Sequence, residues 1–283
     1  WNQAVLLKSQ CVAGCVALFA SLSDERAAEA RMAAPLAKRQ RQDGSGNVRH
    51  EDPFAPPAAD GTLSVYGTAT SRVVKVLWAA AECGISDVRR CNLPPSDLKA
   101  EPWYLALNPK GTVPTFRDGP LVLSESNTIV AYLCQRYGKE AALYPDASPA
   151  SLALAWQWLE FAESTIAGAQ APVFFAVVRK KPFPAGSALK SAENVSALAT
   201  VLAKAMHALE DHLEAEGRMY VLGESFTMAD ITAAVQAYRL FANSGYGFPE
   251  LHPDRFPAIG AWLKRLGTRT AFQVHVQGGM YTK

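Results

Sequence analysis

The sequence predicts an α/β domain followed by an all-helical domain, and three observations support this fold class. Between residues 62 and 140, short strand-like segments interleave with segments of helical periodicity. After a proline-containing linker, residues 150–283 show helical periodicity alone. Hydrophobic residues make up 49% of the 283-residue chain and charged residues 19%, so both domains have enough apolar side chains for a core.

Residues 1–61 are expected to lie outside both domains, as a disordered or targeting extension. From Lys38 to Asp60 the chain is rich in Gly, Pro, Asp, Arg and Gln, a composition that buries too little apolar surface to offset the entropy of ordering. The chain opens with Trp1 and its first methionine is Met32. Three interpretations stand: upstream sequence outside the natural product, a fragment without its true start, or the remains of a targeting segment. The apolar run at Cys11–Leu22 is too short to span a bilayer, and the acidic residues after it suit a transit peptide poorly.

The first domain is predicted to begin with a strand, a helix and a second strand. Residues Leu63–Tyr66 alternate like a short strand, and Gly67 ends the segment. Apolar residues then recur at helical spacing from Val73 to Ala80, and Gly84 is expected to end that helix. A short strand follows at Val88–Cys91.

The rest of this domain is predicted to add two strands and two helices. After a polar loop, the expected elements are a short helix at Trp103–Leu107, a strand at Pro114–Phe116, a turn at Asp118-Gly119 and a returning strand at Leu121–Leu123. Ser124 is expected to cap the last helix, whose apolar face includes Ile129 and Leu133. The resulting order, β-α-β-α-β-β-α, is the thioredoxin-like order.

The segment Asn108–Pro114 (NPKGTVP) points to a ligand-binding loop. Pro109 and Gly111 stop a helix, and Pro114 then begins a strand, a position that suits a cis peptide bond. A cis bond there would turn the backbone of Val113 outward, where it could pair with an extended, peptide-like ligand. The alternative is an ordinary loop that happens to contain two prolines.

A second segment, Leu123–Ile129 (LSESNTI), places Glu125 and Ser126 at the start of a helix. One interpretation is a plain helix cap with an acid that favours the helix dipole. The other uses the same geometry for binding: free N–H groups at the helix start attract a carboxylate, while Glu125 attracts an ammonium. A ligand that carries both groups on one carbon is an α-amino acid head, such as the γ-glutamyl end of glutathione.

Five segments of this chain together resemble the soluble glutathione transferases. They are VYGTATSRVVKVLW, LALNPKGTVPTF, LSESNTIVAYL, GESFTMADITAA and FPAIGAWLKRL, in the order of that family and between about Leu63 and Phe272. The resemblance implies a thioredoxin-like domain (residues 62–140) with a cis bond at Pro114, and an all-helical second domain (residues 150–283). It also implies that the backbone of Val113 pairs with glutathione and that Glu125 and Ser126 bind its γ-glutamyl end.

The family places a hydroxyl or thiol donor just after the first strand to activate the glutathione thiol. A thiol has a pKa of about 8.5, and lowering it by two units requires about 2.7 kcal/mol of preferential thiolate stabilisation. We expect Ser71 to supply this hydroxyl, with Thr70 second and Thr68 third, because Ser71 stands directly before the helix. The loop has no cysteine, which indicates a serine-type site, and Tyr66 is expected to pack in the strand. Alternatively, Ser71 serves only as a helix cap.

Two departures from the family pattern leave the transferase class unassigned. Members often carry Lys, Gln or His in the Asn-Pro loop for the glycine carboxylate of glutathione, where this chain has Gly111 and Thr112. Thr112 would be a weaker substitute, and Lys99 falls where many members place a basic residue for that carboxylate. The loop at residues 67–71 also differs from the commoner forms of the family.

The second domain is predicted to consist of helices joined by short breaks. A long helix starts near Leu152, and prolines interrupt it at Lys180–Ser187. The helix at Val195–Glu216 carries a stripe expected to be core: Leu198, Val201, Leu202, Ala205, Leu209 and Leu213. Thr227 and Asp230 form a capping box with a structural role. The aromatic candidates for an electrophile pocket are Trp156, Phe161, Phe174, Phe175, Tyr238 and Phe241, although most are expected to be core.

Composition narrows the classes of function. The net charge of +2 gives no field that would recruit nucleic acid, no segment is long and apolar enough for a membrane span, and no zinc or other metal pattern is present. The five cysteines have no regular spacing, which favours a reducing compartment. A cytoplasmic location is therefore expected, with organelle targeting by the extension as the alternative.

The leading hypothesis is a detoxification enzyme that conjugates glutathione, as co-substrate, to apolar electrophiles or reduces organic hydroperoxides. The family further implies a homodimer. Two alternatives use the same fold: a non-catalytic protein that binds glutathione or a hydrophobic ligand, and a protein-interaction module. A dinucleotide-binding enzyme is excluded because no Gly-x-Gly-x-x-Gly follows the first strand.

Overall fold

The computed structural model describes residues 62–178 and 192–281 of the chain. The predicted extension at 1–61 and the predicted helix break at Lys180–Ser187 lie outside the described residues. Between Thr62 and Tyr137 the elements are β1 (Leu63–Tyr66), α3 (Val73–Glu82), β2 (Val88–Cys91), α4 (Pro95–Ala100), α5 (Pro102–Leu107), β3 (Thr115–Asp118), β4 (Leu121–Ser124) and α6 (Ser126–Tyr137).

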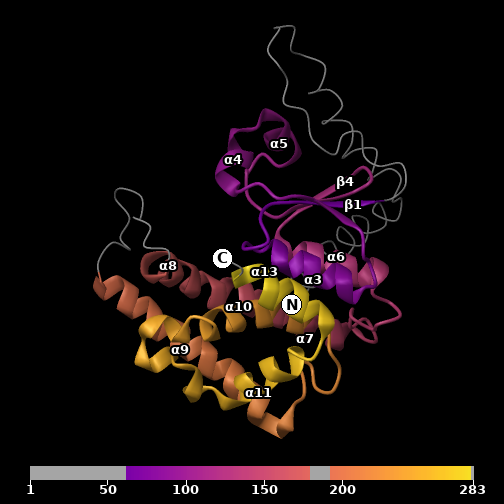
Figure 1. Cartoon of the computed structure of the whole chain (residues 1–283). Helices are drawn as coiled ribbons and strands as arrows, with labels where there is room; N and C mark the ends of the chain where they lie inside the picture. Colours follow the sequence, from indigo (N-terminus) through magenta and orange to yellow (C-terminus); the bar gives the residue numbers. More distant parts are fainter. Residues whose placement is uncertain (1–61, 179–191, 282–283) are drawn as a thin grey trace, which may run out of the picture.

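The four strands form one mixed sheet in the order β2-β1-β3-β4. Strand β1 pairs with β2 in parallel and with β3 antiparallel, and β3 pairs with β4 antiparallel. Helices α3 and α6 cover one face of the sheet, while α4 and α5 lie over the other (Figure 1). The predicted thioredoxin-like order is confirmed, with one addition: the expected polar loop contains α4, where Pro95 begins the helix and buried Leu98 anchors it.

Alternation along β1 divides the two faces of the sheet. Leu63 and Val65 join the large core beneath the sheet, whereas Tyr66 packs on the opposite face against Trp103 and Tyr104. The prediction that Tyr66 packs is confirmed, because its side chain is fully buried. Burial of both faces explains why all four residues of this central strand are buried.

The start of α6 differs from the prediction. Ser124 does not cap this helix. It is the last residue of β4, and its backbone pairs with Thr115 of β3. Glu125 occupies the N-cap position, and its side chain makes no capping hydrogen bond. One residue therefore joins strand to helix, and Glu125 makes the turn with a positive φ of 71°.

The chain from Pro149 onward is helical. Its main helices are α7 (Pro149–Glu160), the π-helical segment η1 (Phe161–Ala167), α8 (Gly168–Val177), α9 (Ala192–Glu214), α10 (Met228–Phe241) and α11 (Pro257–Leu266). Short turns follow α9 and α10: η3 (Ala215–Gly217), η4 (Ser244–Gly247), η5 (Pro249–Leu251) and η6 (Pro253–Arg255). The chain ends in α12 (Thr270–Phe272), η7 (Gln273–Gln277) and α13 (Gly278–Tyr281). Among the helices of residues 62–178 and 192–281, none combines the length and apolarity needed to cross a membrane.

Helix α3 connects the sheet to the helical part of the chain. Trp78 is fully buried and contacts Phe226 and Phe272, both of which follow α9 in the sequence. At the end of α3, Glu82 accepts two hydrogen bonds from Arg269, at 2.8 and 2.6 Å. Apolar packing and a two-bond ion pair therefore hold α3 against the C-terminal helices.

One prediction about α9 needs correction. Val201 is 48% exposed and does not belong to the core stripe. Two histidines of α9 are half-buried: His207 contacts Phe256, and the ring of His212 lies 4.2 Å from that of Trp158. Aromatic neighbours from other helices, which the sequence does not place, account for the burial of both rings.

The capping box at the start of α10 is confirmed. The Thr227 side chain accepts a hydrogen bond from the Ala229 N–H, and Asp230 accepts one from the Thr227 N–H at 2.9 Å. Asp230 also accepts hydrogen bonds from the Val221 N–H and the indole of Trp262. Burial of Asp230 raises its pKa to about 6. Asp230 thus has a structural role, and no chemistry needs to be assigned to it.

Replacing Thr227 by Ala is expected to lower the free energy of unfolding by about 1 kcal/mol or more, since the first turn of a buried helix loses its side-chain acceptor. Urea unfolding followed by circular dichroism measures the change. Thr227→Ser keeps the hydroxyl and should unfold near the wild-type midpoint. Equal midpoints for Ala and Ser would contradict the role of the cap.

Candidate functional site

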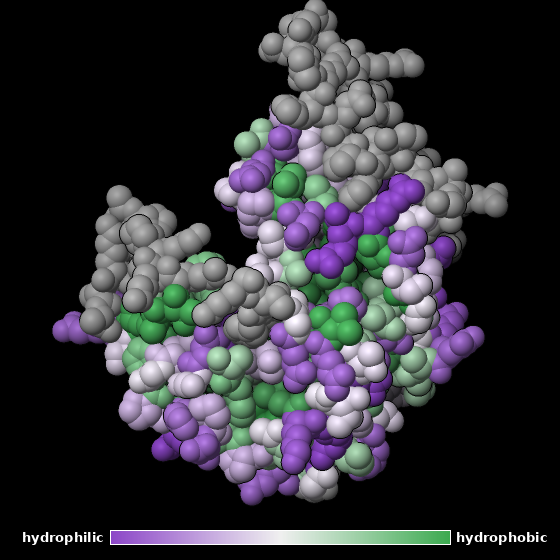
Figure 2. Space-filling view, viewed as in Figure 1, coloured by the Kyte–Doolittle hydropathy of each residue, from purple (hydrophilic) through white to green (hydrophobic). Residues whose placement is uncertain are grey.

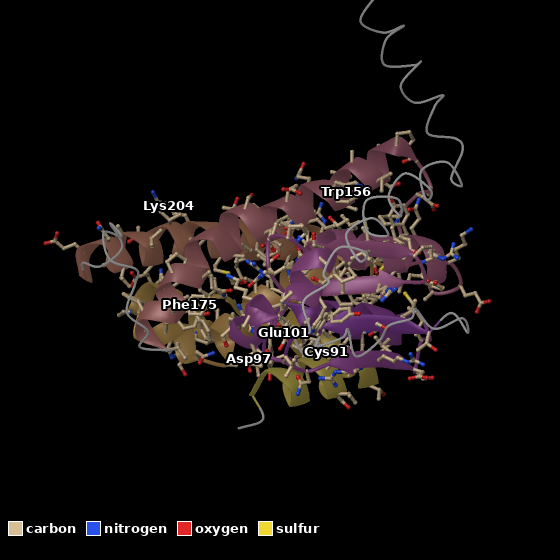
Figure 3. All side chains as sticks on the ribbon, turned by 90° about the horizontal axis from the view of Figure 1, so that it is seen from above. Cys91, Asp97, Glu101, Trp156, Phe175 and Lys204 are labelled. Atoms are coloured by element: carbon tan, nitrogen blue, oxygen red, sulfur yellow. The ribbon has the colours of Figure 1, made fainter. Side chains whose placement is uncertain are left out.

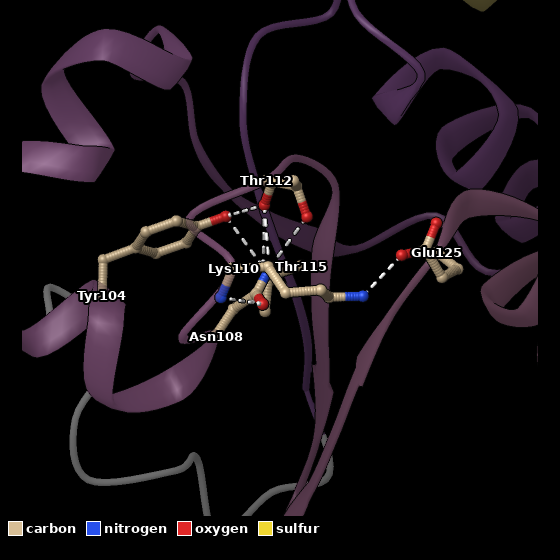
Figure 4. Close-up of polar contacts among 6 residues, drawn as sticks. All are labelled: Tyr104, Asn108, Lys110, Thr112, Thr115 and Glu125. Carbon is tan, nitrogen blue, oxygen red and sulfur yellow. Dashed lines mark hydrogen bonds and ion pairs between the residues drawn. The ribbon is translucent and has the colours of Figure 1, made fainter.

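The loop between α5 and β3 is held by a compact set of hydrogen bonds (Figure 4). The Thr112 carbonyl accepts from the Tyr104 hydroxyl at 2.5 Å and from the Asn108 amide at 2.9 Å. Thr115 bonds to Tyr104 and Asn108 as well, at 2.8 and 3.0 Å. The peptide bond between Val113 and Pro114 is cis, as predicted. The loop that carries Val113 is therefore fixed from both sides.

The backbone of Val113 is available to a ligand. Within residues 62–178 and 192–281, no hydrogen bond satisfies its N–H or its C=O. Gly67, at the end of β1, lies directly against the Val113 side chain: a Cβ on Gly67 would come within 2.8 Å of the Val113 Cβ. Gly67 also has a φ of 118°, which glycine adopts at little cost. Glycine at this position brings the loop after β1 beside the free edge at Val113.

The N-terminus of α6 provides a second set of free groups. The Ser126 side chain is buried, yet no described residue bonds its hydroxyl, and the backbone N–H groups of Ser126 and Asn127 are also unpaired there. Glu125 is 65% exposed, and its φ of 71° is a conformation that costs a non-glycine residue about 1–3 kcal/mol. Positive φ in a residue other than glycine often marks a functional position, which supports the binding interpretation of Glu125.

Lys110 forms an ion pair with Glu125 that the sequence does not suggest. The Lys110 ammonium lies 2.5 Å from a Glu125 carboxylate oxygen, and both side chains are more than half exposed (Figure 4). The side-chain ammonium of Lys110 therefore occupies the position where the ammonium of a ligand is expected to bind Glu125. The pair joins the Asn108–Thr115 loop to the start of α6, so the two predicted binding segments lie side by side.

The hydroxyls predicted to activate a thiol gather in the turn before α3. Ser71 is half-buried; it donates its hydroxyl to the Thr68 carbonyl at 2.6 Å and accepts from the Val73 N–H at 3.3 Å. The hydroxyls of Thr68 and Thr70 lie 3.2 Å apart. A hydroxyl has one proton, so Ser71 must turn from the Thr68 carbonyl before it can donate to a thiolate.

Lys99 and the C-terminal helix approach the same region. A Cβ on Gly111 would lie 2.9 Å from the Lys99 Cγ, so the Lys99 stem covers the loop that carries Thr112. The Lys99 side chain is exposed, as is Thr112, whose hydroxyl accepts from Asn108 at 3.3 Å. A Cβ on Gly279 would meet Ala69 at 3.8 Å. Helix α13 therefore lies close to the loop that holds the hydroxyls.

A buried charge lies one helical turn beyond Ser71. The Lys75 side chain is fully buried, and its ammonium donates to the Asn127 side-chain oxygen at 3.0 Å and to Glu163 at 3.3 Å. The other Glu163 oxygen accepts from Arg72 at 2.7 Å. Burial lowers the pKa of Lys75 to about 8, while the charge of Glu163 opposes that shift. Neither Lys75 nor its partners are site residues that the sequence indicates, because a lone Lys in an apolar helix carries no pattern.

A hollow adjoins these segments. Figure 2 shows the surface indented beside the part that carries α4 and α5. Phe175 of α8 is 46% exposed and lies on the same side of the molecule as Asp97 and Glu101, whereas Trp156 lies on the opposite side (Figure 3). Phe175 is thus the aromatic candidate with free surface near the hollow. Phe161 packs edge-on against Trp158 instead.

A large cavity elsewhere does not contain the predicted residues. It measures about 750 Å³ and lies between the end of α6, α7 and the end of α9. Its walls include Tyr144, Trp158 and His212, and none of the predicted site residues. Within residues 62–178 and 192–281 no group of His, Cys, Asp and Glu side chains is arranged to hold a metal ion. The candidate site rests on converging polar groups and not on cavity size.

The described groups together suit a zwitterionic head followed by an extended peptide. The start of α6 offers N–H groups for a carboxylate, Glu125 offers a carboxylate for an ammonium, and Val113 offers a free backbone edge. Ser71, Thr70 and Thr68 place hydroxyl donors at the start of α3. This arrangement can bind a peptide-like ligand and stabilise an anion on it.

Comparison with known proteins shows the family to which both parts of the chain are similar. The family model described as the glutathione S-transferase N-terminal domain matches residues 71–136, and the model described as the C-terminal domain matches residues 192–265. Glutathione S-transferase 3 of Zea mays is 31% identical over 217 residues, which cover 75% of this chain and 91% of that protein. Glutathione S-transferase GstB of Escherichia coli K12 is 33% identical over 172 residues, 59% of this chain and 74% of the relative.

A solved structure of similar shape has a ligand. The theta class glutathione S-transferase of Xanthomonas axonopodis pv. citri, crystallised with glutathione bound, superposes with a TM-score of 0.64. It is 32% identical in sequence, and the match covers 78% of this chain and 100% of that chain.

Replacing Glu125 by Gly is expected to raise the free energy of unfolding by about 1 kcal/mol. Relief of the strained positive φ stabilises the folded state by about 1–3 kcal/mol. The larger conformational entropy that glycine loses on folding offsets about 0.5–1 kcal/mol of this gain. Glu125→Gln keeps the strain and loses only an exposed ion pair, which contributes about 0–1 kcal/mol. Chemical unfolding compares the two variants, and a Gly variant no more stable than the Gln variant would refute strain at this position.

Proposed function

Because the chain belongs to the glutathione transferase family, we propose that it binds glutathione and transfers it to apolar electrophiles. Residues 62–140 would hold glutathione, and residues 150–283 would contribute the second wall of the electrophile site. The observation that carries the proposal is the side-by-side placement of a free backbone edge at Val113 and a free helix start at Ser126. Together they match the peptide and the α-amino acid head of glutathione.

Each proposed contact follows from a group in the site. The Val113 N–H and C=O pair with the cysteinyl backbone of glutathione. The Ser126 hydroxyl and the adjacent N–H groups donate hydrogen bonds to the γ-glutamyl carboxylate, and Glu125 binds the γ-glutamyl ammonium after exchange with Lys110. Lys99 and Thr112 lie where the glycine carboxylate would end. Pro114 holds Val113 in place.

Thiol activation is assigned to the hydroxyls before α3. Ser71 is the proposed donor to the thiolate, since it stands at the positive end of α3 and is half-buried. The thiolate then attacks the electrophilic carbon and the leaving group departs with the bonding electrons. With a hydroperoxide, the thiolate attacks the outer oxygen instead, and a second glutathione completes the reduction to alcohol, water and glutathione disulfide.

The electrophile would enter the hollow beside α8. Phe175 exposes apolar surface there, and Val178 is 36% exposed at the end of the same helix. Figure 2 shows hydrophobic surface over this part of the molecule. An apolar wall favours electrophiles with little charge, so that their transfer from water is favourable. We further propose a homodimer in a reducing compartment such as the cytoplasm, where free thiols such as Cys83, Cys91 and Cys134 persist.

One observation favours a second candidate, a non-catalytic glutathione-binding protein. Ser71 donates its only proton to the Thr68 carbonyl, and a thiolate would have to compete for it. Binding needs only Val113, Glu125 and Ser126. The two candidates differ in turnover and not in binding.

Ser71→Ala is expected to lower kcat for conjugation with a generic aryl halide by about 100-fold, the effect of removing one hydrogen-bond donor from a developing anion. The matched controls Thr68→Val and Thr70→Val should keep most of the rate. If the loss follows one of the threonines instead, the hydroxyl assignment moves to that residue. A wild type that is retained on immobilised glutathione but turns over neither aryl halide nor hydroperoxide would establish the non-catalytic role.

Glu125→Ala is expected to weaken glutathione binding by at least tenfold, because an ion-paired ammonium of the ligand loses its partner. Isothermal titration calorimetry measures the dissociation constant directly. Glu140→Ala, at an exposed position after α6, is the matched control and should bind like the wild type. Unchanged binding in Glu125→Ala would refute the placement of the γ-glutamyl end.

A further inference from the structure

Lys75 is an unusual residue for its position. It stands within Val73–Ala80 of α3, where every residue is buried and all side chains except that of Lys75 are apolar. Desolvating an ammonium costs several kcal/mol unless partners compensate, and an apolar side chain of equal length would avoid that cost. Lys75 has two partners from two other elements: Asn127 of α6 at 3.0 Å and Glu163 of η1 at 3.3 Å.

Asn127 links this charge to the proposed binding site. It directly follows Ser126 in the first turn of α6. Its side-chain oxygen accepts from Lys75, and its side-chain nitrogen donates to the Leu159 carbonyl of α7 at 2.9 Å. The first turn of α6 is therefore tied to α3 and to α7 by one amide group. A shift of that amide would move Ser126 with it.

Glu163 completes the network from the helical part of the chain. One of its oxygens accepts from Lys75 and the other from Arg72, at the start of α3. It lies in η1, a π-helical segment of a kind that is frequent at functional sites. The charged groups that act on Lys75 are Glu163 from η1, Arg72 from its own helix and Arg239 from α10.

We propose that Lys75, through Asn127, is a positioning residue that sets the first turn of α6 for the head group of glutathione. This inference rests on the proposed function. Fixing Ser126 and the free N–H groups beside it determines how well the γ-glutamyl carboxylate is bound. Lys75 itself does not touch the ligand, and its effect is therefore on glutathione affinity. Ser71, by contrast, acts on the reaction step.

The test is a double-mutant cycle with Lys75→Met, Asn127→Ala and the double variant, in the full chain. Lys75→Met removes the ammonium at similar length, and Glu163 keeps Arg72 as its partner, so no unpaired buried charge remains. We expect each single variant to raise the KM and the calorimetric dissociation constant for glutathione by about tenfold, with kcat at saturating glutathione within about threefold of wild type. The double variant should be no worse than either single variant, because both break the same connection.

Glu82→Gln is the matched control. It weakens the ion pair with Arg269 at the other end of α3, so it disturbs the same interface away from the site. We expect a lower melting temperature with an unchanged KM. If Lys75→Met does not fold, Asn127→Ala tests the proposal by itself, because it breaks the same hydrogen bond from the other side and is expected to give the same rise in KM.

Three results overturn the proposal in distinguishable ways. A wild type without saturable glutathione binding removes the proposed function and this inference with it. An active wild type whose Lys75 and Asn127 variants lose melting temperature but keep the KM, as Glu82→Gln does, leaves the proposed function intact and makes Lys75 purely structural. Additive effects in the cycle likewise exclude the connection through Asn127.

Discussion

The burial of α3 on all sides is the constraint on which the rest of the molecule depends. Its residues from Val73 to Ala80 are buried between the sheet and the C-terminal helices. The helix therefore cannot shift, and the turn at Ser71 before it is held in place. The same burial obliges Lys75 to find partners, and Asn127 and Glu163 supply them from two other elements. Packing of one helix thus sets both the hydroxyl turn and the charged network beside it.

The candidate site is built largely from backbone groups, and the side chains around them act as supports. Tyr104 and Asn108 hold the Thr112 carbonyl, which fixes the loop that carries Val113. Gly67 lets that loop approach the end of β1. A site of this kind tolerates changes in exposed residues as long as the supporting contacts remain.

The helical part of the chain has a role in folding and a role beside the proposed site. Asp230 gathers hydrogen bonds from three segments and secures the start of α10, which is a matter of folding. Glu163 and Phe175 lie on the continuous helical stretch that begins with α7, where one faces the buried Lys75 and the other exposes apolar surface. A single stretch of helix therefore connects the proposed head-group site with the proposed electrophile site.

The sequence by itself determined the thioredoxin-like order of the elements except for α4, indicated a candidate cis bond before Pro114, and determined the capping box at Thr227. Each depends on local periodicity, on proline and glycine, or on side chains within one turn, so neighbouring residues are enough to specify it. Only the tertiary structure decided the positive φ of Glu125, its ion pair with Lys110, and the burial of Lys75 against Asn127 and Glu163. Those contacts join residues far apart in the chain, and their geometry depends on how the sheet and the helices pack. A single sequence carries no local pattern for such packing, which is why Lys75 does not stand out in the sequence.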